Sequence, residues 1–202
     1  RPHAMTHVKA PGLITRTDQL EALLAQLRQH DAIAIDTESD SLYAYHEKVC
    51  LIQLSIPGAD FLIDPLAGID LQPLAPLMAD DKIQKVFHAS EYDVMCLRRD
   101  FGFTFHNLFD TMWAARILGW KRVGLGDILQ EQFGITLDKK WQRHNWGKRP
   151  IEPAALARVL KYSRALVGAA KELGMPVLGT EQYPKGLGPM VKEIAEVLPA
   201  PS

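Results

Sequence analysis

The stretch that most constrains this chain is residues 32–40, AIAIDTESD, where a short apolar run ends abruptly in acidic residues. Because side chains alternate between the two faces of a β-strand, Asp36 and Glu38 would leave the strand on the same side. Two carboxylates on one face repel each other unless a cation lies between them, and their oxygens suit Mg²⁺ or Mn²⁺. A strand that stops at a polar turn explains the same residues, so the choice between a metal site and an ordinary strand end depends on the rest of the sequence.

Composition supports a folded domain and excludes several classes of protein. The chain has 202 residues, of which 47% are hydrophobic, so we expect one domain, or two if one is small. The net charge of −1 means that any basic surface must be local. Cys50 and Cys96 lie in apolar runs and are expected to be buried free thiols. No apolar run or signal-peptide pattern predicts a membrane partner, so we expect a cytoplasmic protein. Residues 1–12 are interpreted as a tag remnant, Arg1–Met5, and an N-terminal tail.

Hydrophobic periodicity predicts an alternation of strands and helices. Strands are expected at 32–36, 49–56, 61–64 and 83–88. Helices are expected at 18–30, 74–79, 109–118, 126–133 and 153–173, with another that begins near Ser90 and a last one at 191–198. A meander followed by alternating strands and helices predicts an α/β fold with a mixed central sheet flanked by helices.

Asp93 supplies a third acidic position, at the start of the helix that follows the strand 83–88. If that strand neighbours the first one, Asp93 can face Asp36 across the crevice where open α/β sheets bind ligands. Three carboxylates there would need divalent ions, and two ions about 3.5–4 Å apart can support phosphodiester cleavage. An acid in the first turn of a helix is also ordinary, and Asp93 alone is better explained that way.

Five segments in order are similar to one family: DTE at 36–38, VCLIQLS, KVFHASEYDVMCLRRDFG, NLFDTMWAARILG and DKKWQRHNWGKRP. They resemble ribonuclease D and its relatives, which are 3′→5′ exonucleases of the DEDD group with a ribonuclease H-like fold. The resemblance covers about residues 13–150. It implies an enzyme that removes nucleotides from the 3′ end of single-stranded RNA, with Asp36, Glu38 and Asp93 as catalytic residues and as ligands of two Mg²⁺ or Mn²⁺ ions.

The resemblance also implies residues that contact nucleic acid. Two of them flank Asp93, and the others lie in the basic stretch 139–149, where tryptophans alternate with cations. The set is His88, Tyr92, Lys139, Lys140, Trp141, Arg143, Lys148 and Arg149. A solvated basic loop whose tryptophans, Trp141 and Trp146, fill the core explains this stretch equally well. Asp110 is interpreted as a helix cap and not as a ligand.

The family's third motif, a Tyr followed four residues later by an Asp, is missing. Without gaps its positions fall on Arg158 and Tyr162, and one helical turn later they fall on Tyr162 and Leu166. No aspartate follows Asp138. The fourth metal ligand is therefore absent, which chiefly harms the second metal, and we expect weak or absent activity.

The tail shows a second resemblance. LARVLKYSRALVGAAKELGMPVLGTEQYPKGLGP, within about residues 154–190, resembles isochorismatase-like hydrolases, whose catalytic Asp, Lys and Cys lie outside this piece. Residues 151–202 are thus expected to be a foreign helix–strand–helix segment that packs on domain 13–150 or forms a homodimer. The alternative to an exonuclease is a catalytically inactive chimeric scaffold, natural or engineered, whose graft supports folding or oligomerisation. A third candidate is a module that binds nucleic acid without cleaving it.

Overall fold

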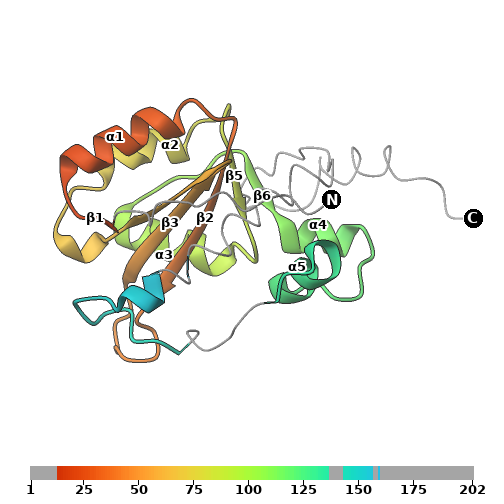
Figure 1. The fold of residues 1–202 in the computed structure, drawn as a ribbon. Helices are drawn as coiled ribbons and strands as arrows, with labels where there is room; N and C mark the ends of the chain where they lie inside the picture. Colours follow the sequence, from red (N-terminus) through yellow and green to blue (C-terminus); the bar gives the residue numbers. More distant parts are fainter. Residues whose placement is uncertain (1–12, 137–142, 157–158, 160–202) are drawn as a thin grey trace, which may run out of the picture.

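The computed structural model describes residues 13–136, 143–156 and 159. A six-stranded mixed sheet in the order β1-β4-β3-β2-β5-β6 forms its centre, with helices around it (Figure 1). The strands are β1 (Leu13–Ile14), β2 (Ala32–Ser39), β3 (Val49–Ile56), β4 (Ala59–Ile63), β5 (Gln84–Phe87) and β6 (Leu108–Asp110). The helices are α1 (Thr17–Leu27), α2 (Ala75–Met78), α3 (Glu91–Phe101), α4 (Thr111–Ile117) and α5 (Leu125–Phe133), with short 3₁₀ turns at Pro65–Ala67 and Gln72–Leu74.

β2 occupies the middle of the sheet and has one neighbour of each kind. It pairs antiparallel with β3 and parallel with β5, while β5 continues in parallel to β6. β3 pairs antiparallel with β4, which completes the expected meander. The strand near residues 83–88 thus does lie beside the first strand, which was the condition for Asp93 to approach Asp36, and the helix after β5 starts next to the end of β2.

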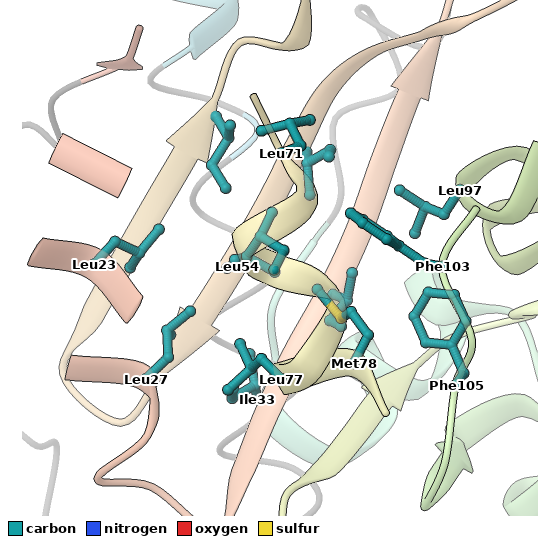
Figure 2. Close-up of a cluster of buried hydrophobic side chains, with 14 of the residues drawn as sticks. Leu23, Leu27, Ile33, Leu54, Leu71, Leu77, Met78, Leu97, Phe103 and Phe105 are labelled. Atoms are coloured by element: carbon teal, nitrogen blue, oxygen red, sulfur yellow. The ribbon is translucent and has the colours of Figure 1, made fainter. Parts of the chain in front are cut away.

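One face of the sheet carries the main hydrophobic core (Figure 2). The leucine stripe of α1 packs there against strand residues such as Ile33 and Leu54 and against α2. Leu97 of α3 and the aromatic rings of Phe103 and Phe105 extend the same cluster. Each buried aliphatic side chain of this size contributes about 1.5–3 kcal/mol, so this face holds α1, α2 and α3 on the sheet.

The opposite face carries the acidic residues. Asp36 lies opposite Gln53, and Glu38 lies opposite Leu51, in the antiparallel ladder of β2 and β3. Directly opposed residues share a face, so both carboxylates point to the side where Leu51 lies. Leu51 belongs there to a second buried cluster formed with Cys50, Leu62, Trp146, Ile151, Ala155 and Val159. The segment after residue 143 thus covers the face that bears Asp36 and Glu38.

Several expectations differ from the structure. β1 and β6 were not predicted, because two and three residues are too few for a recognisable period, and Phe109-Asp110 was assigned to a helix start. Cys50 and Cys96 are buried free thiols, as expected. Of the predicted helix 153–173, only 153–156 and 159 are described, and they are helical. The strand and helix predicted after residue 173 lie outside the described residues. Within the described chain, no helix has the length and apolarity needed to cross a membrane.

Candidate active site

The three acidic residues meet where β2 ends and α3 begins. The backbone N–H of Thr37 lies 3.1 Å from Asp36 Oδ1 and 3.1 Å from Asp93 Oδ1. The Thr37 hydroxyl also donates to Asp93 Oδ1, at 2.5 Å. Alternation along β2 puts the Thr37 side chain on the face where α3 packs and puts Asp36 and Glu38 on the other face. Thr37 therefore joins Asp93 to the strand between the two other acids.

Burial is the largest cause that raises the pKa of all three carboxyl groups. Burial, and then the charge of Asp93, raise the pKa of Asp36 to about 7. Burial, together with the charges of Asp36 and Asp93, raises the pKa of Glu38 to about 9. Burial also raises the pKa of Asp93, against the opposing effect of the Thr37 hydrogen bonds. In the described part of the chain, no Lys, Arg or His forms an ion pair with these carboxylates.

The donor set fits a hard divalent cation in kind. Carboxylate oxygens are the ligands that Mg²⁺ and Mn²⁺ prefer, and a cation would offset the repulsion that raises these pKa values. As placed, no three Asp, Glu, His or Cys side chains among the described residues lie close enough to hold an ion. Asp93 directs Oδ1 to the N–H and the hydroxyl of Thr37. The three carboxylates adjoin one another without forming a closed set of ligands.

Asp110 builds the turn that delivers Asp93. Its Oδ1 accepts from the N–H of Met112 at 2.9 Å, at the N-terminus of α4, which confirms the predicted helix cap. The same carboxylate accepts from the N–H groups of Ala89 and Ser90, at 3.1 and 2.7 Å, between β5 and α3. Ala89 has a φ of 58°, a conformation uncommon for a residue with a side chain. Asp110 therefore stabilises this turn from outside it.

His88 and Tyr92, which flank Asp93 in the sequence, are both hydrogen-bonded within the fold. The Thr111 hydroxyl donates to the Phe87 carbonyl at 3.1 Å, so His88 Nδ1, 2.9 Å from the same hydroxyl, must be the donor. Burial lowers the pKa of His88, which favours a neutral ring at pH 7. The Tyr92 hydroxyl donates to Glu47 Oε2 at 2.7 Å and lies 3.1 Å from Ser39 Oγ. Neither His88 nor Tyr92 supplies a cation for phosphate.

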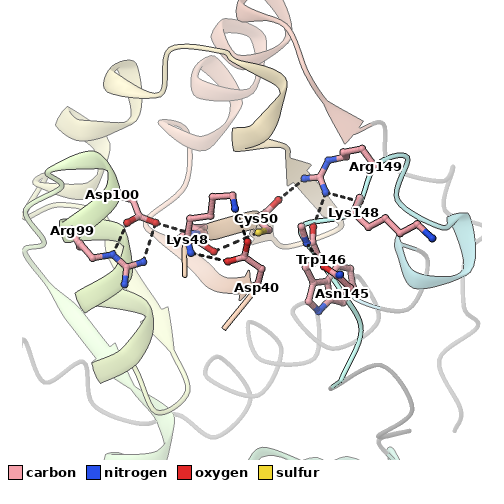
Figure 3. Close-up of polar contacts among 11 residues, drawn as sticks. Asp40, Lys48, Cys50, Arg99, Asp100, Asn145, Trp146, Lys148 and Arg149 are labelled. Carbon is pink, nitrogen blue, oxygen red and sulfur yellow. Dashed lines mark hydrogen bonds and ion pairs between the residues drawn. The ribbon is translucent and has the colours of Figure 1, made fainter. Parts of the chain in front are cut away.

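The basic segment divides into exposed and structural residues (Figure 3). Arg149 donates to both oxygens of Asp64, at 2.8 and 2.6 Å. It also donates to the carbonyls of Cys50, Trp146 and Lys148. The Trp146 side chain is only 2% exposed and lies in the cluster with Leu51, so for Trp146 the core-filling interpretation is correct. Arg143 and Lys148 are exposed. Lys139, Lys140 and Trp141 lie outside the described residues.

Sequence reasoning missed the residues that support the site. Thr37 stands between the two acids of DTE, yet its bond to Asp93 depends on packing between distant segments. Glu47 also went unnoticed: its Oε1 accepts from Arg99 Nη1 at 3.2 Å, and its Oε2 accepts from Tyr92. A Glu near an Arg in sequence would have been a signal, but these two residues are far apart along the chain. Only the fold brings them together.

The fold and site define a class of protein. A mixed sheet with carboxylates at the end of its central strand and at the start of the next helix is the arrangement of ribonuclease H-like exonucleases, and solved structures of that kind match this one. A family profile described as 3′-5′ exonuclease matches residues 11–165. The chain belongs to this 3′-5′ exonuclease family.

Individual relatives are ribonucleases. A ribonuclease D of Nitrobacter hamburgensis is 32% identical over 191 residues, which covers 94% of this chain and 49% of the relative. The crystal structure of Escherichia coli RNase D, described as an exoribonuclease involved in structured RNA processing, superposes with a TM-score of 0.76. It is 30% identical, with 82% of this chain and 44% of that chain covered.

A second similar structure was determined with a metal. NrnC of Brucella melitensis with bound Mg²⁺ has a TM-score of 0.60 and 25% identity, over 72% of this chain and 72% of that one. The curated ribonuclease D sequences are longer: the chain spans 49%, 37% and 38% of the length of three of them. The alignment over 191 residues and the family profile both continue past Pro150.

Proposed function

We propose that the chain hydrolyses phosphodiester bonds at the 3′ end of single-stranded RNA, with a requirement for Mg²⁺ or Mn²⁺. The observation that carries the proposal is a group of three neighbouring carboxylates without an ion-pair partner among the described residues: the buried Asp93, and the partly exposed Asp36 and Glu38, of which Asp36 and Asp93 accept from the N–H of Thr37. Carboxylates placed together away from water destabilise the fold, so a group of this kind indicates a functional site. The names of the relatives supply the substrate.

In this proposal each element of the site has a separate task. Asp36, Glu38 and Asp93 would hold divalent metal, which supplies an activated water and stabilisation of the leaving oxygen. Thr37 holds Asp93 against the end of β2 through its hydroxyl and its N–H. Asp110 fixes the turn before α3, and thereby the position of Asp93 along the strand end. Within the described part of the basic segment, Arg143 and Lys148 are the exposed cations that can reach phosphate.

We further propose that the activity is impaired, because the third-motif acid is absent. The sequence places Arg158 and Tyr162, or Tyr162 and Leu166, where Tyr and Asp would stand. An isochorismatase-like origin of residues 154–190 accounts for this loss. It competes with the alignments that continue past Pro150 as ribonuclease D. A homodimer through residues 151–202, a second bound metal and a cytoplasmic location likewise stay predictions.

The test is digestion of a 5′-labelled single-stranded RNA with Mg²⁺ or Mn²⁺, so that products shortened from the 3′ end form a ladder. The wild-type chain is compared with Asp36→Asn and with Glu21→Gln, an exposed acid on α1 that serves as the matched control. A metal-dependent ladder from wild type and Glu21→Gln, absent with Asp36→Asn, supports the proposal. Binding without shortening would favour the nucleic-acid-binding module, and neither binding nor digestion would favour the inactive scaffold.

A further inference from the structure

The loop between β2 and β3, residues 40–48, exposes an unusual amount of apolar surface. Leu42 is 66% exposed, Tyr43 is 54% exposed and Tyr45 is 97% exposed. Together with Tyr92, whose hydroxyl contacts this loop, they make four of the eight large exposed apolar side chains in the described chain. The Tyr45 ring meets the neighbouring His46 ring edge to face, with centroids 4.9 Å apart, and is otherwise open to solvent. Core packing therefore does not explain its position, and grouped exposed apolar surface marks interaction sites.

This loop is held firmly on its polar side. Lys48 Nζ binds Asp40 Oδ2 at 2.6 Å, and the Lys48 N–H binds Asp40 Oδ1 at 2.9 Å. Glu47 is held by Arg99 and by Tyr92. These contacts neutralise the two acids of the loop. They also leave the rings of Tyr43 and Tyr45 outside the hydrogen-bonded part, so the rings stand on a preorganised support.

The aromatic loop lies against the basic segment that begins at residue 143. The Tyr43 hydroxyl donates to the Arg143 carbonyl at 2.5 Å, and a Cβ added to Gly147 would come within 3.1 Å of Asp40 Oδ2. In Figure 1 the cyan segment lies beside the orange turn that joins β2 and β3. Arg143 and Lys148 are exposed, and neither forms an ion pair with another described residue. Exposed rings and exposed cations thus share one surface.

We infer that this composite surface, formed by loop 40–48 and Arg143–Arg149, binds the unpaired bases and phosphates of a single strand of nucleic acid that leads into the carboxylate site. Aromatic faces that stack on bases, beside cations that follow phosphates, are the usual means of holding a single strand. The surface begins one residue beyond β2, whose last residues include Glu38. The inference rests on the proposed function, since it concerns the strand that the site would shorten.

The test measures binding separately from cleavage. A fluorescent single-stranded RNA is titrated in EDTA at about 50 mM salt and followed by anisotropy. Tyr45→Ala should weaken binding about tenfold, whereas Tyr45→Phe, which keeps the ring, should bind like wild type. Trp113→Ala removes an exposed ring from α4 and is the matched control, which should change nothing. Arg143→Gln should reduce the slope of log affinity against log salt by about one.

A second probe identifies stacking as the cause. On an RNA of the same length with abasic upstream positions, Tyr45→Ala should lose its effect, because no base remains to stack. The inference is overturned if the RNA does not bind, if Tyr45→Ala binds like wild type, or if Trp113→Ala weakens binding equally. Tyr45-dependent binding without metal-dependent digestion would refute the proposed function and leave this surface standing. Metal-dependent digestion, with binding that does not depend on Tyr45, would support the proposed function and refute the role of this surface.

Discussion

Metal binding to this chain should release protons, and the number follows from the site. At pH 7 a carboxyl group with a pKa of about 7, such as Asp36, is half protonated, and one with a pKa of about 9, such as Glu38, is almost fully protonated. Carboxylates must lose their protons to become ligands, so metal held by both residues should displace about 1.5 protons at pH 7. Asp93, whose pKa is also raised, adds to this number.

The assay is calorimetric titration of the metal-free chain with Mn²⁺ in buffers of different ionisation enthalpy, which yields the protons released per ion. Apparent affinity should rise with pH between about 6 and 8 and level off above about 9, where Glu38 is ionised without metal. Glu38→Gln should reduce the release by about one proton. Release of less than about half a proton at pH 7, or an affinity that does not change with pH, would refute the reasoning.

The same pKa values predict how stability without metal depends on pH. Glu38 binds its proton more tightly in the folded chain than in the unfolded one, so folding is weakened as pH rises from the unfolded pKa, about 4.3, towards the folded pKa, about 9. Below that window Glu38 is protonated in both states and adds nothing to the pH dependence of stability. Melting in EDTA should therefore show a decline towards alkaline pH that Glu38→Gln reduces. A midpoint equally pH-dependent in both proteins would contradict this assignment.

Three further predictions concern other parts of the chain. Thr37→Val removes the hydroxyl bond to Asp93 and should weaken Mn²⁺ binding about tenfold in a titration. Thr37→Ser keeps the hydroxyl and should bind Mn²⁺ like wild type. Equal binding by both variants would show that the hydroxyl does not position Asp93. Arg149→Ala leaves the buried Asp64 carboxylate without its partner and should cost about 3 kcal/mol, a fall of roughly 6–12 °C in Tm by calorimetry, whereas Asp81→Ala, at an exposed position, should change Tm little. Arg158→Tyr with Tyr162→Asp restores the missing motif in one register and should raise the rate of RNA digestion about 100-fold or more. Leu166→Asp tests the other register. If neither variant digests RNA faster, the missing acid does not limit activity.

The sequence predicted what depends on local pattern. VCLIQLSI is long, apolar and rich in β-formers, and the strand at Val49–Ile56 has the predicted bounds. The acids of DTE sit at the end of the central strand because alternation and the apolar run together determine where the strand becomes polar. Asp110 could be recognised as a cap because capping requires only the next two or three N–H groups.

Contacts between distant segments could not be predicted in this way. Lys85 lies in a strand and would be expected to reach solvent, yet it is fully buried, with Nζ donating to the Asp80 and Ile83 carbonyls. Arg149 resembles a phosphate-binding residue in sequence, but the fold presents Asp64 and three carbonyls to it. Each outcome depends on which acceptor the folded chain supplies, and composition carries no information on that.

The ion pair between Arg149 and Asp64 also separates folding stability from catalytic activity, two properties that are commonly assayed together. Trp146, Arg149 and Ile151 fasten the chain to the sheet before the positions where the third motif would stand. Ala155 and Val159 of the same buried cluster continue this attachment past Ile151. An exchange of the following segment would therefore keep the attachment if apolar residues stayed at these two positions. Expression yield and melting temperature can remain high in a variant that has lost its catalytic acid. A screen of variants of this chain for well-folded protein therefore selects for this attachment. Only a digestion assay selects for catalytic activity.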